Sequence, residues 1–333
     1  MLIFIFRRFL QLLLVLWGGA TLLFFLFFAL PTNPAELLAG GANKAPNPQV
    51  VANIKAKYGL DKPLIVQYET YLDNAIHLDL GTSYKDKTPV SEIIAKRLPG
   101  SLRLATWAMA IEVVFGIGLG VLSARKRNSF SDTATTIFAV VASAIPVFLL
   151  AYLLKQITGV YAFQHHWPSW ARWPTLGIGP NEWRFGIIPT GAQFKYLFQP
   201  AVVLASVSTA VVARLTRASM LEVNNADYVR TARAKGIKEG RVVRKHVLRN
   251  GMIPVVTFLG VDFGTLIGAA ILTETVFNWP GLGSKVADAA RAGDGPVVIG
   301  LSLVVILIYG ITSMLVDISY AFLDPRIRLG AQE

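Results

Sequence analysis

Uncharged apolar runs are the feature that most limits how this sequence folds. After Arg7 and Arg8, no charged residue occurs until Glu36. An α-helix of about 20 residues crosses the roughly 30 Å hydrocarbon core of a bilayer. The run is longer than the apolar region of about 7–15 residues in a secretory signal peptide, and no small-residue cleavage site ends it. We therefore predict a first transmembrane helix over residues 9–30, with both arginines on the cytoplasmic side.

Further apolar runs follow, at about residues 102–124, 133–157, 197–221, 251–275 and 296–320. The turn at 125–127, the loop after the fourth run and the tail around 326–328 are strongly basic, as cytoplasmic segments of membrane proteins tend to be. The pattern predicts an all-α membrane protein with six transmembrane helices and both termini in the cytoplasm. Pro146 lies inside the third run, where we expect a kink or break.

The overall composition also indicates a membrane protein. The chain is 53% hydrophobic and only 16% charged, whereas soluble domains carry about 25% charged residues. A net charge of +12 would suggest nucleic acid as the partner of a soluble protein. In a membrane protein, cationic cytoplasmic loops explain it, so we expect contact with membrane lipid and none with nucleic acid.

Several kinds of chemistry have no support in the sequence. Without cysteine there is no disulfide, thiolate metal site or cysteine nucleophile. No GxxxxGK[ST] motif is present, so the chain lacks its own phosphate-binding loop and is not expected to hydrolyse ATP. His165 and His166 are adjacent, and neighbouring side chains do not readily share a metal ion without a third ligand. A polar loop is the simpler interpretation, and we predict neither a metal nor a cofactor bound by this chain.

Two polar regions are expected outside the membrane. The first, residues 31–100, has apolar side chains at helical spacing (Leu64, Tyr68, Tyr71 and Leu72), which predicts a short amphipathic helix. The second, residues 159–195, contains several tryptophans, which suit the membrane interface. Docking of an outer protein partner is an alternative role for these tryptophans.

The most basic segment of the chain is the loop 222–250, between the fourth and fifth runs. Asn224 and Asn225 offer side-chain oxygens for an N-cap, and Asp227 suits the first turn of a helix. Gly236 then provides a C-terminal stop. The loop therefore predicts a short, separately capped helix. Its spacing places Tyr228 on one face with Thr231, Ala232 and Lys235.

The segment Asp227-Tyr-Val-Arg-Thr-Ala-Arg-Ala-Lys-Gly236 resembles the cytoplasmic "EAA" loop of permease subunits in binding-protein-dependent ABC importers. The match is best to the dipeptide, oligopeptide and nickel permease group, first-permease type. Arg230-Thr231-Ala232 stands where the general motif has Glu-Ala-Ala, a change typical of this group. The resemblance continues through Arg7-Arg8, Gly59-Leu-Asp-Lys-Pro-Leu64, Gln67-Tyr68, Asp79-Leu-Gly-Thr-Ser83, Arg97-Leu-Pro99, Ile145-Pro-Val-Phe148, Leu248-Arg-Asn250, Thr273-Glu274, Trp279-Pro-Gly-Leu-Gly283 and Asp324-Pro-Arg-Ile-Arg328.

The resemblance implies the type I ABC importer fold. Its parts would be the N-terminal end with the first helix (1–30), an extracytoplasmic segment (31–100), a permease core (101–325) that includes the cytoplasmic loop 222–250, and a cytoplasmic tail (326–333). It also implies the partners: a second, similar permease subunit, two cytoplasmic ABC ATPase domains that use ATP and Mg²⁺, and an extracytoplasmic solute-binding protein. The location implied is a bacterial or archaeal cell membrane.

Candidate site residues fall into three groups. The resemblance makes the loop helix the element that couples the permease to the ATPase, through Asp227, Tyr228, Arg230, Thr231, Ala232, Ala234, Lys235 and Gly236. A basic helix lying on anionic lipid is the alternative. Glu112 and Asp262 are carboxylates inside predicted spans, where a charge is costly, so each is a candidate for the translocation path, as is Pro146 for a gating kink. Contact between helices is the plainer role. Glu274, Trp279 and Gly281 are candidates for an outer gate or docking site, or for anchoring a loop.

The function we predict is import of peptides or a related small solute by alternating access, driven by ATP at the partner subunits. An ion-coupled secondary transporter or channel is the alternative, although a carrier is expected to show several ionisable groups within the membrane. A membrane enzyme lacks a recognisable catalytic constellation. The sequence does not distinguish dipeptides, longer peptides, glutathione-like compounds and nickel chelates.

Overall fold

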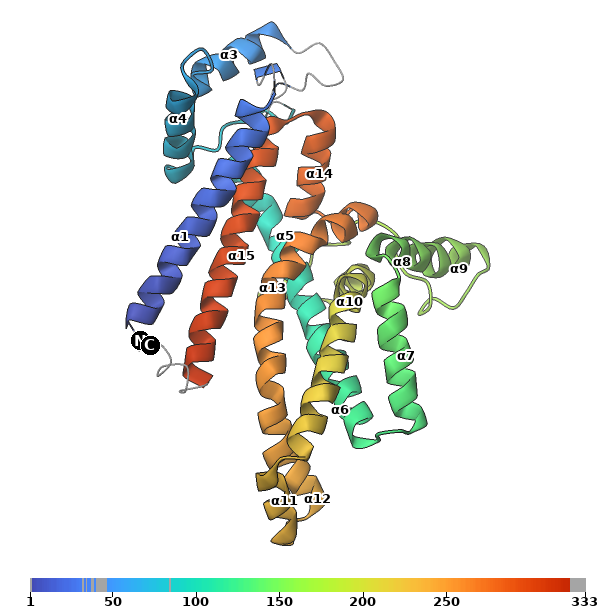
Figure 1. The fold of residues 1–333 in the computed structure, drawn as a ribbon. Helices are drawn as coiled ribbons and strands as arrows, with labels where there is room; N and C mark the ends of the chain where they lie inside the picture. The colour runs from blue at the N-terminus through green and yellow to red at the C-terminus, as the bar shows by residue number, and fades with distance from the viewer. Residues whose placement is uncertain are drawn as a thin grey trace. The chain divides into compact units, whose positions relative to one another are not determined.

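The computed structural model describes residues 2–31, 33, 35–36, 39, 47–83 and 85–323, and the predicted tail 326–333 lies outside them. Its described residues form helices and one short hairpin (Figure 1). Among them are six helices long and apolar enough to cross a membrane. The prediction of an all-α chain with six such helices is confirmed. The chain divides into a terminal unit, residues 1–102 with 279–333, and a central unit, residues 103–278.

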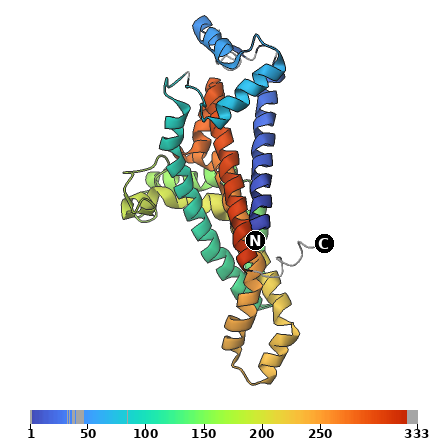
Figure 2. The ribbon, with the colours of Figure 1, turned by 90° about the vertical axis from the view of Figure 1, so that its left-hand side faces the viewer.

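In the terminal unit, α1 (Leu2–Phe24) runs alongside α15 (Gly295–Leu323) (Figures 1 and 2). The two helices approach closely because Gly19 faces Ile306 and Gly310 faces Leu12: a Cβ on either glycine would lie within 2.8 Å of the opposite side chain. A π-helical turn, η1 (Phe25–Ala29), extends α1. The first predicted span is thus confirmed, with its start shifted toward the N-terminus.

The polar region of the terminal unit contains α3 (Pro48–Tyr58) and α4 (Leu64–Ile76). α4 is the predicted amphipathic helix. Its Tyr68 and Tyr71 pack against Phe24 and Phe28 in an aromatic cluster. Edge-to-face and tilted ring contacts of this kind add to the gain from burial alone, so α4 is fixed against α1 and η1.

Two features of the terminal unit differ from the sequence prediction. α5 (Val90–Ile111) begins at Val90 rather than at about residue 102. Its first turns are amphipathic: Ile93 is buried, whereas Lys96 forms an ion pair with Glu92 at the surface, so hydropathy alone missed them. A further helix, α14 (Leu282–Ala292), precedes α15 and packs on it through Leu282.

The central unit is built around α10 (Gly191–Asn224). Its remaining elements are η2 (Glu112–Gly116), α6 (Ile117–Arg125), α7 (Phe130–Ala144), α8 (Val147–Leu154), η3 (Lys155–Tyr161), α9 (Ala162–Gln164), the hairpin β1 (Trp183–Arg184) and β2 (Ile188–Pro189), α11 (Asp227–Ala234), α12 (Glu239–Val242), η4 (Val243–Leu248) and α13 (Arg249–Phe277). α10 contacts η2, α6, α7, α8 and α13. Its many buried alanines, such as Ala205, Ala210 and Ala213, let these neighbours come close.

The predicted third span is not one helix. α7 ends at Ala144, the backbone is extended at Ile145 and Pro146, and α8 starts at Val147 (Figure 1). Proline has no N–H to donate and its ring clashes with the preceding turn, which explains the break. α7 has 15 residues, or about 22 Å at 1.5 Å per residue, which is too short to cross a bilayer alone. The expected break at Pro146 is confirmed, and continuity over 133–157 is wrong.

Candidate functional site

The loop predicted to couple this chain to a partner lies at one end of the central unit. Both views show α11 and α12 beyond the ends of α10 and α13 (Figures 1 and 2). Val229 and Ala232 of α11 are buried there against Met220, Val242 and Val247. These contacts give the short helix its own apolar base. An eight-residue helix is not stable by itself in water, so this base is what holds α11 in place.

The ends of α11 match the sequence prediction only in part. Ala226, not Asn224 or Asn225, is the N-cap residue, and it makes no side-chain cap. Asn224 instead accepts a hydrogen bond from Arg233 Nη2 at 2.5 Å. Arg233 also binds Glu239 at 2.8 and 3.0 Å, and this carboxylate raises the pKa of Arg233 above its ordinary value. Gly236 follows the helix with φ +73°, a conformation that favours glycine, so the predicted stop is confirmed.

One face of α11 is exposed. It carries Asp227, Tyr228, Arg230, Thr231, Ala234 and Lys235. We call this set the exposed face of α11. The Tyr228 ring is 45% exposed, and its hydroxyl accepts a hydrogen bond from Asn250 Nδ2 at 3.0 Å, which fixes the direction of the ring.

Ala232 does not belong to this face. The sequence placed it beside Tyr228 and Thr231, but only 6% of it is exposed, because its methyl group packs into the apolar base. Ala232 therefore contributes to the site by holding α11 in place through the apolar base. The spacing argument failed because Ala232 lies four residues after Tyr228 but also three residues after Val229, and the buried side of the helix includes both Val229 and Ala232.

A partly buried ion pair that the sequence analysis missed stabilises the same end of the unit. Arg217 of α10 donates to both carboxylate oxygens of Asp132 in α7, at 2.7 and 2.9 Å. Ser123 Oγ and the Asn128 N–H donate to the same carboxylate. Asp132 is 5% exposed, and bidentate pairs of this kind are strong. The sequence signal that could have indicated this pair is Asp132, a single acid in the first turn of the helix that follows the basic stretch 125–127.

The structure brings two of the predicted path residues together. Glu112 begins η2, Asp262 lies in the middle of α13, and their carboxyl groups come close enough to hydrogen bond. Both are buried, Glu112 completely. In this conformation neither carboxyl group is open to a solute. Pro146 lies elsewhere, at the exposed break between α7 and α8.

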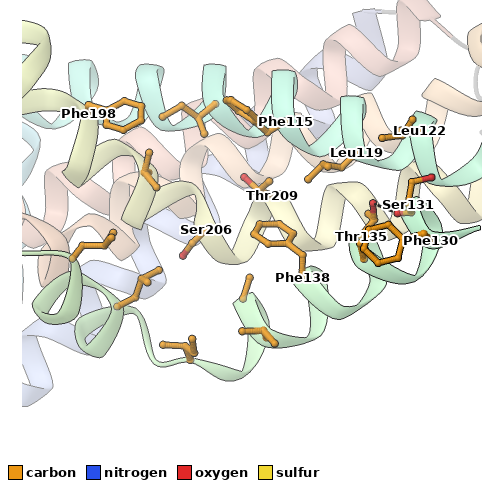
Figure 3. Close-up of a pocket in the computed structure, with 18 residues that line it drawn as sticks. Phe115, Leu119, Leu122, Phe130, Ser131, Thr135, Phe138, Phe198, Ser206 and Thr209 are labelled. Atoms are coloured by element: carbon orange, nitrogen blue, oxygen red, sulfur yellow. Dashed lines mark hydrogen bonds between the residues drawn. The ribbon is translucent and has the colours of Figure 1, made fainter. Parts of the chain in front are cut away.

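A cavity of about 850 Å³ opens between α7, α8, α10 and the η2–α6 segment (Figure 3). Phe115, Phe138 and Phe198 lie around it, and Ser206 and Thr209 of α10 provide polar atoms at one wall. Among the described residues that line it, none is charged. An uncompensated charge is costly in such surroundings, so the cavity suits hydrocarbon and not a zwitterionic peptide.

The three outer candidates are all buried. Glu274 lies in the last turns of α13, within the central unit. In the terminal unit, Trp279 is fully buried and donates its indole N–H to the Gly100 carbonyl at 2.9 Å. Gly100 has to be glycine, because a Cβ there would lie 2.4 Å from the Pro280 carbonyl oxygen. Gly281 is the N-cap residue of α14. This placement favours anchoring of the segment over direct docking.

Comparisons with known proteins agree with these observations. The model of the family "Binding-protein-dependent transport system inner membrane component" matches residues 116–329, and the model of its N-terminal part matches residues 1–105. The dipeptide transport system permease protein DppB of Alkalihalophilus pseudofirmus is 36% identical, with 98% of this chain and all of that protein covered.

The glutathione transport system permease protein GsiC of Escherichia coli K12 is 38% identical over 98% of this chain and 99% of that protein. Both similarities run the length of the chain and include both units. The chain is therefore an integral membrane protein that belongs to the inner membrane permease family of binding-protein-dependent ABC importers, in the dipeptide and oligopeptide permease group.

Proposed function

We propose that this chain is one of two permease subunits of an ATP-driven importer that takes up short peptides. Similarity to a dipeptide permease and a glutathione permease over 98% of the chain is the observation that carries this proposal. Glutathione is itself a small peptide, so both relatives point to one substrate class. Transport proceeds by alternating access between an outward-open and an inward-open state.

The exposed face of α11 is the proposed contact with a cytoplasmic ABC ATPase. Tyr228 presents a large aromatic ring of fixed direction, which suits a central anchor in a pocket. Arg230 and Lys235 around it suit acidic groups at the rim of such a pocket. Ala234 is small and exposed, so it lets the partner surface come close. A lipid-bound helix is disfavoured, because the apolar side of α11 is already buried within the chain.

The energy for transport comes from the partners in this proposal. Two ATPase domains bind ATP and Mg²⁺, close on each other and move α11 of each permease. Because Val229 and Ala232 fix α11 to the ends of α10 and η4, its movement passes directly to the longest buried helix of the central unit. A solute-binding protein delivers the peptide on the opposite side of the membrane. Both chain termini are on the ATPase side.

Purification and reconstitution test the proposal together. The chain, extracted in mild detergent from its native cells, should bring ATPase subunits and a second permease with it. Proteoliposomes with the binding protein should take up a labelled dipeptide only when ATP and Mg²⁺ are supplied, with glutathione as the competing substrate. Uptake that runs on an ion gradient without ATP, with no ATPase copurifying, would overturn the proposal in favour of a secondary transporter.

A further inference from the structure

The Glu112–Asp262 pair lies deep inside the central unit. Glu112 is on η2 and Asp262 on α13, and α10 contacts both elements. Glu112 has no exposed surface and Asp262 only 7%. Both belong to helices that are long and apolar enough to cross a membrane. Ionisable groups in such positions are costly and need a partner.

The segment that begins at Glu112 packs closely on α10. η2 and α6 lie directly against α10 at two glycines. A Cβ on Gly116 would come within 2.7 Å of Val212, and one on Gly120 within 2.5 Å of Thr216. A π-helical turn, η2, starts at Glu112, and such turns are frequent at functional sites in proteins.

In the part of the chain that the structure describes, no cation neutralises the pair. Among the described residues, no lysine, arginine or histidine forms an ion pair with Glu112 or Asp262. On α10, Arg214 is exposed and Arg217 is bound to Asp132. They lie six and nine residues beyond Ser208, or about 9 and 14 Å along the helix. α6 and α13 carry their arginines, Arg125 and Arg249, at the ends toward the α11 loop.

The oxygens of the two carboxyl groups also lack hydrogen-bond donors as long as both acids are ionised. Within the described part of the chain, neither Glu112 oxygen has a donor, nor has Asp262 Oδ2. The Ser208 hydroxyl of α10 bonds to the Asp262 carboxylate. An ionised carboxylate only accepts hydrogen bonds, so two of them side by side repel and leave their oxygens unsatisfied. A single proton removes the repulsion and gives Asp262 a donor, because a protonated carboxyl donates to its neighbour.

We propose that Glu112 and Asp262 form a buried proton-binding site that holds one proton between the two carboxyl groups. The proton sits on a Glu112 oxygen and is donated to Asp262. Asp262 is the anion because it also accepts from Ser208. The bound proton joins η2 to α13 at the centre of the unit, and the pair keeps a single negative charge. This inference does not depend on which solute the transporter carries.

Infrared spectroscopy tests the proton directly. The full-length chain, purified with its partner subunits in lipid nanodiscs, should show the carbonyl stretch of a protonated carboxylic acid at neutral pH. The band should shift in D₂O and disappear in Glu112→Gln. Glu222→Gln, which changes an exposed acid of α10, is the matched control and should keep the band. Absence of the band from the wild type at neutral pH, or its persistence in Glu112→Gln, would overturn the proposal.

Thermal unfolding of the same samples is the second readout. Loss of the bound proton leaves two buried carboxylates side by side, which repel, so wild-type stability should fall as the pH rises from neutral to alkaline. Glu112→Gln and Asp262→Asn each place an amide N–H where the proton lies, so their melting temperatures should depend less on pH over this range. Equal pH dependence in all three proteins would contradict the proposal, as would stabilisation of the wild type at alkaline pH by Na⁺ or by a dipeptide, which would indicate a cation site.

Discussion

α11 and α14 are both short helices next to predicted membrane spans, and each has an aromatic residue and a glycine of the quoted motifs within it or beside it. They use these residues in opposite ways. Tyr228 on α11 is 45% exposed and held by one hydrogen bond, whereas Trp279 before α14 is fully buried and hydrogen bonded to Gly100. A motif residue on α11 is therefore free to meet a partner, and one at α14 is occupied by the chain's own packing. The comparison separates a motif residue that stays exposed from one that the chain's own packing buries.

The largest expected difference in stability between the two regions follows from removing the aromatic side chain of each. Trp279→Ala should destabilise the protein by about 3–5 kcal/mol, because it leaves a cavity and removes the indole hydrogen bond to Gly100. Tyr228→Ala should cost no more than about 1 kcal/mol, because the ring is already half in solvent. Melting temperatures in nanodiscs measure both. Similar losses for the two variants would show that α11 is packed like α14 and would weaken its assignment as a docking helix.

Two alanines on α11 allow a buried and an exposed position to be compared within one helix. Ala232→Glu places a charge in the apolar base and should lower stability by about 2 kcal/mol or more, with reduced membrane levels. Ala234→Glu, two residues away on the exposed face, should leave stability within about 0.5 kcal/mol of wild type. A fluorescence-detected size-exclusion profile after a heat challenge reports both. If Ala232→Glu is as stable as Ala234→Glu, the apolar base is not what holds α11.

The exposed aromatic should matter for binding and not for folding. Truncation of a central interface anchor costs about 2 kcal/mol, which is roughly a 30-fold weaker association. We expect this loss for Tyr228→Ala when the purified ATPase is titrated onto the permease in nanodiscs. Trp170→Ala serves as a control, because Trp170 is 76% exposed but lies far along the chain from α11. Unchanged ATPase affinity in Tyr228→Ala would remove Tyr228 from the interface.

A small effect of acid should arise at the ion pair between α14 and Asp86. Lys285 of α14 donates a hydrogen bond to Asp86, and this bond holds the pKa of the Asp86 carboxyl below its usual value. A depressed pKa contributes stability at neutral pH that is lost as the pH falls through it. The pair is partly exposed, so the loss is no more than about 1 kcal/mol. Lys285→Met should remove this part of the acid sensitivity, whereas Arg230→Met should not, because its partner Asp227 is 99% exposed.

Sequence reasoning was most successful where a periodic pattern extends over many residues. The apolar runs predicted the six long helices, and Pro146 predicted the break after α7. Sequence reasoning failed where a helix is amphipathic or where contacts between residues distant in the sequence determine the structure. The first turns of α5 and all of α14 are amphipathic and were not recognised as helices. Asp132 and Arg217 are 85 residues apart, and no local pattern indicates that they meet.

The candidate site shows the same limit. The position of α11 and its stop at Gly236 followed from local chemistry, but the burial of Ala232 depends on Met220 and Val247 from neighbouring elements. Likewise, Glu112 and Asp262 were each identified as unusual from the sequence. Their contact depends on how η2 and α13 pack around α10, which only the tertiary structure supplies.

Retention of the ATPase by Ala234→Glu is the most direct test of the central claim, that the exposed face of α11 carries the contact with the ATPase. The variant and the wild type are extracted in mild detergent from membranes containing equal amounts of permease. We predict that Ala234→Glu keeps its second permease subunit and its melting temperature but loses most of the copurifying ATPase and the ATP-driven uptake. Full retention of the ATPase together with unchanged uptake would contradict the account.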